Sequence, residues 1–305
     1  MASHDHAAHG HHHAPPADMG AAFAIGIGLN TLFVAAEVAA GLMSGSLALL
    51  ADAGHNLSDV LALSLAWGAS VLARRAPTGR RTYGFRKATI LASLANAILL
   101  LLAVGAIASE AIHRIGAPAP VATNIVMLTA GLGVLINGLT AMLFLRGHGD
   151  LNVRGAFLHM TSDAAVSLAV VIGAVVMART GLSWIDPALS LLIGAVIVWG
   201  TWSLLHESAD LALDAAPRGV DVEAVRAWLS DLPGVAEVHD LHIWAMSTTE
   251  TALTAHILRP DNPDGDAFLR TACEGLEHRF HIGHATLQIE TDPAASCRLA
   301  PAEVV

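Results

Sequence analysis

The sequence predicts a polytopic α-helical membrane domain with six transmembrane helices, followed by a small two-layer α+β domain. Hydrophobic residues make up 54% of the 305 residues and charged residues only 14%, whereas soluble domains carry about 25% charged residues. The mean hydropathy is +0.57. Because most apolar residues lie in the first two-thirds of the chain, that region is expected to hold the transmembrane spans.

The first 18 residues have the composition of a disordered arm rich in histidine. Such tracts bind metal ions, and the interspersed Asp, Ala and Gly residues favour a native metal-binding arm over an expression tag. The arm lacks a basic segment and a cleavage-like site, so it is not a secretory signal. Its histidines are His4, His6, His9, His11, His12 and His13.

Six apolar stretches of spanning length follow the arm. Lipid offers no hydrogen-bonding partners to the backbone, so all six are expected to be α-helices. Abundant Gly and Ala permit these helices to pack closely. The predicted ranges are 20–43, 48–73, 88–113, 121–145, 155–179 and 184–206.

Basic residues in the connecting loops predict the orientation of the spans. Arg114 and Arg179 are the only ones on one side, whereas the other side holds Arg74, Arg75, Arg80, Arg81, Arg86, Lys87, Arg146 and Arg154. The positive-inside rule therefore places both termini in the cytoplasm.

After the sixth span, Pro217 and Gly219 interrupt the apolar pattern. The predicted elements are a helix over 221–232, strands over 235–245 and 251–258, a helix over 266–280 and a strand over 285–290. This αββαβ order predicts helices on one face of a sheet. A core of this size is marginal alone, which favours dimerisation.

Two spans contain the same pattern, His-x-x-x-Asp: His55 and Asp59 in the second, His159 and Asp163 in the fifth. Positions i and i+4 share a helix face, so two facing helices would supply two nitrogens and two oxygens. That set fits tetrahedral coordination, with zinc as the first candidate. Charged groups at bilayer depth cost about 2.5–3.5 kcal/mol each and usually mark function. The alternative to a metal site is that these polar side chains form hydrogen bonds between packed helices.

This ligand set also connects metal binding to protons. Two carboxylates and two neutral imidazoles balance a 2+ charge, and all four must be deprotonated to bind metal. Metal and protons therefore compete for the same atoms. Calcium and magnesium prefer shells of oxygen atoms and are poor fits. The ligand set does not distinguish zinc from cadmium, cobalt or nickel.

Other polar residues in the spans have two interpretations. Asp52 shares a helix face with His55, and either lines the ion path or supports the site from behind its ligands. Glu37, Asn96 and Asn137 are expected to pack helices or to support the ligands.

The chain resembles the cation diffusion facilitator (CDF) family of proton-coupled zinc transporters, of the bacterial cobalt-zinc-cadmium efflux type. The resemblance covers nearly the whole length and rests on 45–55 (GSLALLADAGH), the second His-x-x-x-Asp, 239–244 (HDLHIW) and 286–290 (TLQIE). It implies a six-helix domain, a cytoplasmic ferredoxin-like domain and a homodimer.

The resemblance also implies roles for individual residues. The family's transport site maps onto His55, Asp59, His159 and Asp163, and histidine in the second span is typical of zinc-preferring members. Lys87 and Asp214 match a charge pair that ties the two domains together in some relatives. Thr89 departs from the pattern, since several members carry Glu there.

In the cytoplasmic domain the resemblance implies a second metal site, with His239, His256 and Glu290 as ligands. Where some members supply another histidine this chain has Gly283, and His284 beside it is a candidate. Further candidates are His242, His278 and His281. The alternative is a surface of solvated histidines.

The expected domains are the disordered His-rich cytoplasmic arm (1–18), the transmembrane transport domain (19–207), the cytoplasmic metal-binding and dimerisation domain (208–296) and a tail (297–305). Cys273 and Cys297 imply no disulfide framework. The net charge of −10 argues against a nucleic-acid partner.

We expect a divalent-metal efflux transporter of the bacterial inner membrane that exchanges cytoplasmic Zn²⁺, and after it Cd²⁺ or Co²⁺, for protons by alternating access. A membrane metal sensor without transport is one alternative. An intramembrane metalloprotease is another, but it needs His-Glu-x-x-His, and His206-Glu207 is not followed by the second histidine.

Overall fold

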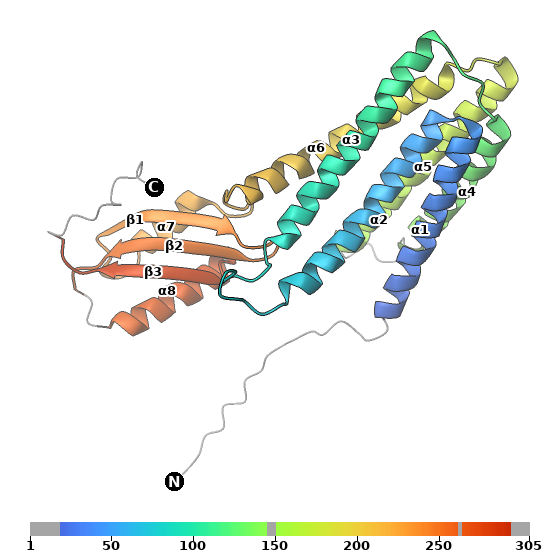
Figure 1. The fold of residues 1–305 in the computed structure, drawn as a ribbon. Coiled ribbons are helices and arrows are strands. Elements are labelled where there is room, and N and C mark those ends of the chain that lie inside the picture. Colours follow the sequence, from blue (N-terminus) through green and yellow to red (C-terminus); the bar gives the residue numbers. More distant parts are fainter. Residues whose placement is uncertain (1–18, 145–150, 262–263, 294–305) are drawn as a thin grey trace.

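The computed structural model describes residues 19–144, 151–261 and 264–293, and the His-rich arm and the tail lie outside these ranges. Figure 1 shows an elongated molecule with a bundle of long helices at one end and a small sheet with two helices at the other. The long helices are α1 (Met19–Ser44), α2 (Leu47–Ala73), α3 (Ala88–Gly116), α4 (Thr123–Phe144), α5 (Leu151–Thr180) and α6 (Ile185–Ala212). The predicted fold class is confirmed.

Five of these helices, α2 to α6, are long and apolar enough to cross a membrane, and α1 contributes the shorter apolar helix Asn30–Ser44. Helix α6 runs past the predicted end of the sixth span at residue 206. The segment 207–212 contains no Gly or Pro, so nothing in it stops the helix before Ala212. The expected domain boundary at 207/208 therefore falls inside α6.

Helix α3 packs against α6, and α4 packs against α5, with α2 touching both pairs. Their shared core is apolar and includes Leu49, Val104, Val126, Val170 and Ile193, each at most 4% exposed. The site residues on α2 and α5 are therefore held by helices that are packed on several sides.

A buried carboxylate joins the first turns of α2 and α6. Asp186, in the first turn of α6, accepts hydrogen bonds from the Ser46 hydroxyl and from the Leu47 backbone N–H at 2.5 and 2.7 Å. Ser46 also caps α2, since its Oγ accepts from the Leu49 N–H at 3.1 Å. A carboxylate at a helix N-terminus satisfies otherwise unpaired N–H groups. Asp186 therefore fixes the two helix ends on the side away from the cytoplasmic domain.

The cytoplasmic domain consists of α7 (Val222–Ser230), β1 (Glu237–Ala245), β2 (Thr251–Leu258), α8 (Gly265–Phe280) and β3 (His284–Glu290). The sheet order is β1-β2-β3, with β1 and β2 antiparallel and β2 and β3 parallel. Alternate residues of β2, from Leu253 to Ile257, are buried against both helices, with Leu229 and Leu276 on the other side of this core. The opposite sheet face carries the polar residues of the strands.

Polar contacts near the start of α3 join the two domains. Lys87 and Asp214 form the ion pair that the resemblance implied. Arg86 lies 2.6 Å from a carboxylate oxygen of Glu250, in the turn between β1 and β2. The backbone N–H of Thr248 donates to the hydroxyl of Thr89 at 3.1 Å, so the position where several relatives carry Glu contacts the cytoplasmic domain.

Candidate metal sites

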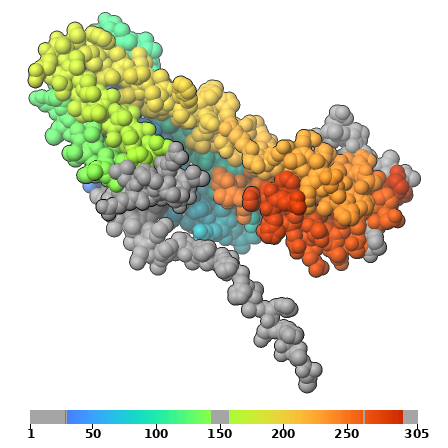
Figure 2. Space-filling view, turned by 180° about the vertical axis from the view of Figure 1, so that it is seen from behind, coloured from blue at the N-terminus to red at the C-terminus, as the bar shows by residue number. Residues whose placement is uncertain are grey.

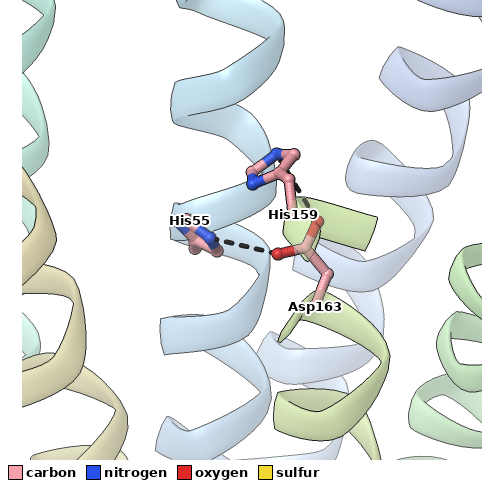
Figure 3. Close-up of side chains that lie close together, drawn as sticks. All are labelled: His55, His159 and Asp163. Carbon is pink, nitrogen blue, oxygen red and sulfur yellow. Dashed lines mark ion pairs between the residues drawn. The ribbon is translucent and has the colours of Figure 1, made fainter. Parts of the chain in front are cut away.

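The two His-x-x-x-Asp patterns lie on facing helices, α2 and α5. Figure 3 shows His55 and His159 each beside one oxygen of the Asp163 carboxylate. Each histidine approaches a carboxylate of the opposite helix: His55 Nε2 lies 3.4 Å from Asp163 Oδ1, and His159 Nε2 lies 3.3 Å from Asp59 Oδ2. His159 Nε2 also lies 3.6 Å from Asp163 Oδ2. The structure thus gathers His55, His159 and Asp163 in one cluster, and Asp59 lies at its edge, in contact with His159.

These separations fit a tetrahedral ion. With metal–ligand bonds of about 2.1 Å, neighbouring ligand atoms of a tetrahedron are about 3.4 Å apart. His55, His159 and Asp163 each offer a ligand atom, and these atoms all lie within 4.8 Å of one another. The imidazole rings stand edge to face with centroids 6.0 Å apart, so their nitrogens can point at one centre.

Buried polar atoms at this site lack hydrogen-bond partners. Asp163 is 2% exposed. Its Oδ1 atom and Nδ1 of His55 have no hydrogen bond among the described residues. Leaving such a group unsatisfied costs about 1–3 kcal/mol, and a bound cation would satisfy the carboxylate. The donor set and its burial therefore fit a metal ion as cargo.

A cavity of about 340 Å³ opens from this cluster. His55, Asp59 and Asp163 line it, together with Asn96 of α3 and α6 residues that extend to Leu204, near the end of α6 that continues into the cytoplasmic domain. Asn96 donates to the hydroxyl of Ser58 at 3.2 Å. The cavity therefore extends from the cluster towards the helix ends that lie nearest the small sheet domain.

Asp52 lies behind the ligands and does not line this cavity. It is fully buried and accepts a hydrogen bond from the Ser167 hydroxyl at 2.8 Å. Glu37 of α1 is equally buried and accepts from the amide of Asn56 at 2.9 Å. Both carboxylates thus connect neighbouring helices one layer away from the metal-binding atoms. Asn137 of α4 is also buried.

The second predicted cluster lies on the sheet face that the helices do not cover. His239 and His256 are directly opposite on β1 and β2, with ring centroids 5.4 Å apart. Glu290 of β3 reaches both, at 3.3 Å from His239 Nε2 and 3.1 Å from His256 Nδ1. One atom from each of the three lies within 4.8 Å of the others.

Sequence reasoning missed Asp240 as a member of this neighbourhood. It has a left-handed backbone (φ 50°) at the irregularity of β1 between His239 and His242. This bulge brings its carboxylate to 2.9 Å from His242 and 3.5 Å from His256. The signal was present, since Asp240 lies inside the HDLHIW motif. Bulges are not visible in strand alternation.

His284 is not part of this cluster. It begins β3 and pairs with Ala252, four residues before His256 on β2. Its ring meets Tyr83 of the α2–α3 loop edge to face, with centroids 5.6 Å apart. At about 3.3 Å per strand residue, it lies too far along the strand to share an ion with His256. His278 lies in the last turn of α8 and His281 is its C-cap, both on the helical layer.

This chain matches two family models and is similar to several known proteins. The model described as the cation efflux transmembrane domain matches residues 23–211, and that described as the cation efflux protein, cytoplasmic domain matches residues 217–292. Metal cation efflux system protein CzcD of Cupriavidus metallidurans is 36% identical over 287 residues, which are 93% of this chain and 90% of CzcD.

Two further relatives have comparable coverage. Zinc transporter ZitB of Escherichia coli is 36% identical over 294 residues, 95% of this chain and 93% of ZitB. The cadmium, cobalt and zinc/H(+)-K(+) antiporter of Bacillus subtilis is 31% identical over 268 residues, 86% of each chain. Both family models are thus described as cation efflux domains, and all three relatives are named for the transport of metal cations.

Proposed function

Because this chain belongs to the cation efflux family, the cation diffusion facilitators, and is a multi-pass membrane metal transporter, we propose that it exports zinc from the cytoplasm in exchange for protons. Cadmium and cobalt are the next substrates, since the ligand set accepts them and the Bacillus subtilis relative is named for them. The observation that carries the proposal is the facing pair His55–Asp163 and His159–Asp59, 3.4 and 3.3 Å apart.

The quartet supports binding and release by one set of atoms. Two carboxylates and two imidazoles neutralise a divalent cation, so the loaded site carries no net charge at bilayer depth. Each ligand atom that binds the metal also binds a proton in its absence. Protons entering from outside would therefore displace the metal, and metal from the cytoplasm would displace protons.

The cavity supports metal entry from the cytoplasm. It leads from the quartet along α2, α3 and α6 towards the cytoplasmic end, whereas Asp186 joins the opposite ends of α2 and α6. This arrangement corresponds to the inward-facing state of an alternating-access cycle. Release then requires the contacts of Asp186 to open and the cavity to close.

The loop charges support a bacterial inner-membrane location with both termini in the cytoplasm. The uncovered sheet face of the cytoplasmic domain supports a homodimer, because a second copy would cover it. The cluster of His239, His256 and Glu290 on that face is a proposed second zinc site, and it would stabilise the domain rather than transport the ion.

Zinc flux into liposomes tests the proposal. The full-length protein is reconstituted, and uptake of Zn²⁺ is followed with an internal zinc-sensitive dye. Asp163→Asn preserves the shape of the side chain and removes its charge. Loss of a residue that only supports a metal ligand lowers metal affinity or activity about 10–100-fold, so loss of a ligand itself should lower zinc uptake at least about 100-fold. Asp266→Asn, on the exposed side of α8, is the matched control and should transport normally. Unchanged flux in Asp163→Asn would overturn the proposal.

The sensor alternative predicts zinc binding without flux in this experiment. The protease alternative lacks support in the geometry. His206 lies on the exposed end of α6 against Trp202, and Glu207 lies 3.5 Å from Arg218. Neither residue joins the metal-binding clusters of the described ranges.

A further inference from the structure

A second cavity, of about 460 Å³, lies where the membrane domain meets the cytoplasmic domain. Its walls come from three places: the end of α2 with Ser70 and Arg74, the start of α3 with Arg86 and Ser93, and the turn between β1 and β2 with Glu250. Figure 2 shows the blue-green end of α2 beside the orange cytoplasmic domain. The volume is in the range of small-ligand pockets, about 300–1,000 Å³.

The surroundings of this cavity are strongly basic, although the chain as a whole has a net charge of −10. Six of its 16 basic residues lie between Arg74 and Lys87, and no acidic residue occurs between Asp59 and Glu110. The local potential at the ends of α2 and α3 is therefore positive, which attracts anions.

Two of these cations are already paired, and Arg74 is not. Arg86 is held by Glu250 at 2.6 Å, which also neutralises the one carboxylate on the cavity wall. Lys87 is held by Asp214. Within residues 19–144, 151–261 and 264–293, no carboxylate lies within 4.0 Å of the Arg74 guanidinium. Its five N–H donors therefore have no carboxylate partner among the described residues.

Exposed tryptophans place the mouth of the cavity near the lipid headgroups. Trp67 is 64% exposed and precedes Arg74 by seven residues, about 10 Å along the helix. Trp199 and Trp202 on α6 are 84% and 56% exposed. Tryptophan concentrates at the membrane–water interface, and anionic lipids give the cytoplasmic leaflet its negative charge.

We propose that this cavity binds the phosphate of an anionic phospholipid headgroup, with the Arg74 guanidinium as its principal contact. Guanidinium matches phosphate oxygens with two parallel N–H bonds. Because both domains form the walls, a bound headgroup holds the β1–β2 turn against α2 and α3. A soluble phosphate has the same chemistry, so the experiment includes it as a separate arm. The site is independent of the proposed transport chemistry.

The test measures lipid binding by the full-length protein in neutral detergent. Phosphatidylglycerol, phosphatidylcholine and inorganic phosphate are titrated separately, and retained lipid is counted by native mass spectrometry beside the melting temperature. Arg74→Gln removes the proposed contact. Arg75→Gln makes the same charge change at the neighbouring exposed arginine, which does not line the cavity.

Wild-type protein should retain phosphatidylglycerol more tightly than phosphatidylcholine, and added salt should weaken the difference. Arg74→Gln should lower the phosphatidylglycerol affinity about fivefold, Arg74→Lys less, and Arg75→Gln less than about twofold. Equal losses in Arg74→Gln and Arg75→Gln would overturn the site in favour of a generally basic loop. Equal retention of both lipids would also overturn it. Stabilisation by inorganic phosphate alone would overturn the lipid assignment.

Discussion

The membrane cluster and the cytoplasmic cluster place the same chemical groups in nearly the same geometry on different backbones. Their imidazole centroids lie 6.0 and 5.4 Å apart, at interplanar angles of 77° and 71°. Their nitrogen–carboxylate separations are 3.3–3.6 Å and 3.1–3.3 Å. Donor geometry alone therefore does not distinguish a transport site from a static one.

The supporting elements do distinguish them. The side chains of the membrane cluster lie on two separate helices beside a cavity of about 340 Å³, so a small shift of α5 against α2 would separate them. The side chains of the cytoplasmic cluster lie on neighbouring strands whose ladder hydrogen bonds fix their register. We therefore expect metal to move through the first cluster and to stay in the second.

The largest expected effect is that of His159→Ala. It removes a ligand at 3.3 Å from Asp59 and 3.6 Å from Asp163, and zinc flux should fall at least about 100-fold. Zinc binding by the cytoplasmic cluster should be unchanged, as measured by equilibrium dialysis of the same variant. Loss of both sites together would mean that the two clusters do not act separately.

His55→Asp is expected to change selectivity rather than abolish transport. The substitution replaces nitrogen by oxygen, which manganese prefers more than zinc does. The ratio of Mn²⁺ to Zn²⁺ flux in liposomes should rise about tenfold, or about 1.4 kcal/mol. His113→Asp, at an exposed position in the last turn of α3, is the control. An unchanged ratio in His55→Asp would contradict the role given to this ligand.

His256→Ala tests the static cluster. Bound zinc per chain should fall by one ion, since the contacts of His256 with Glu290 at 3.1 Å and with Asp240 at 3.5 Å are lost. A ligand at 100 times its Kd stabilises the folded state by about 2.7 kcal/mol, so added zinc should raise the melting temperature less in the variant. Flux should fall less than about threefold. A loss as large as that of His159→Ala would erase the distinction between the clusters.

Lys87→Gln should have the smallest effect. Both partners of the Lys87–Asp214 pair are substantially exposed, at 43% and 59%, and such pairs contribute about 0–1 kcal/mol. Thermal unfolding of the wild type, Lys87→Gln, Asp214→Asn and the double variant gives a double-mutant cycle. The coupling free energy between the two side chains should be under about 1 kcal/mol. A larger coupling would mean that this pair, more than the Arg86–Glu250 contact, holds the domains together.

The sequence predicts the membrane cluster better than the cytoplasmic one, for a physical reason. In a helix the spacing of four residues alone puts His55 with Asp59, and His159 with Asp163, on shared faces. In the sheet, the meeting of His239 with His256 depends on strand register, and the role of Asp240 depends on a bulge. Neither follows from alternation. The same limit explains why the prediction for His284 was wrong. His284 is adjacent in sequence to Gly283, but it pairs with Ala252, four residues before His256 along β2.

Some features of the membrane domain also needed the structure. Helix length was predicted within a few residues, except that α6 continues to Ala212. The contact of Asp186 with the first turn of α2 joins residues 140 positions apart, and a single sequence contains no signal for it. The pairing of each histidine with the carboxylate of the other helix likewise depends on tertiary packing.

Zinc flux under an imposed pH gradient tests most directly whether the quartet exchanges metal for protons. Proteoliposomes containing the full-length protein are given zinc outside, with either an acidic interior or equal pH on both sides. Zinc uptake should be faster with the acidic interior and should be accompanied by proton efflux, and Asp163→Asn should abolish both. Zinc uptake that proceeds at the same rate whatever the pH gradient would contradict this exchange.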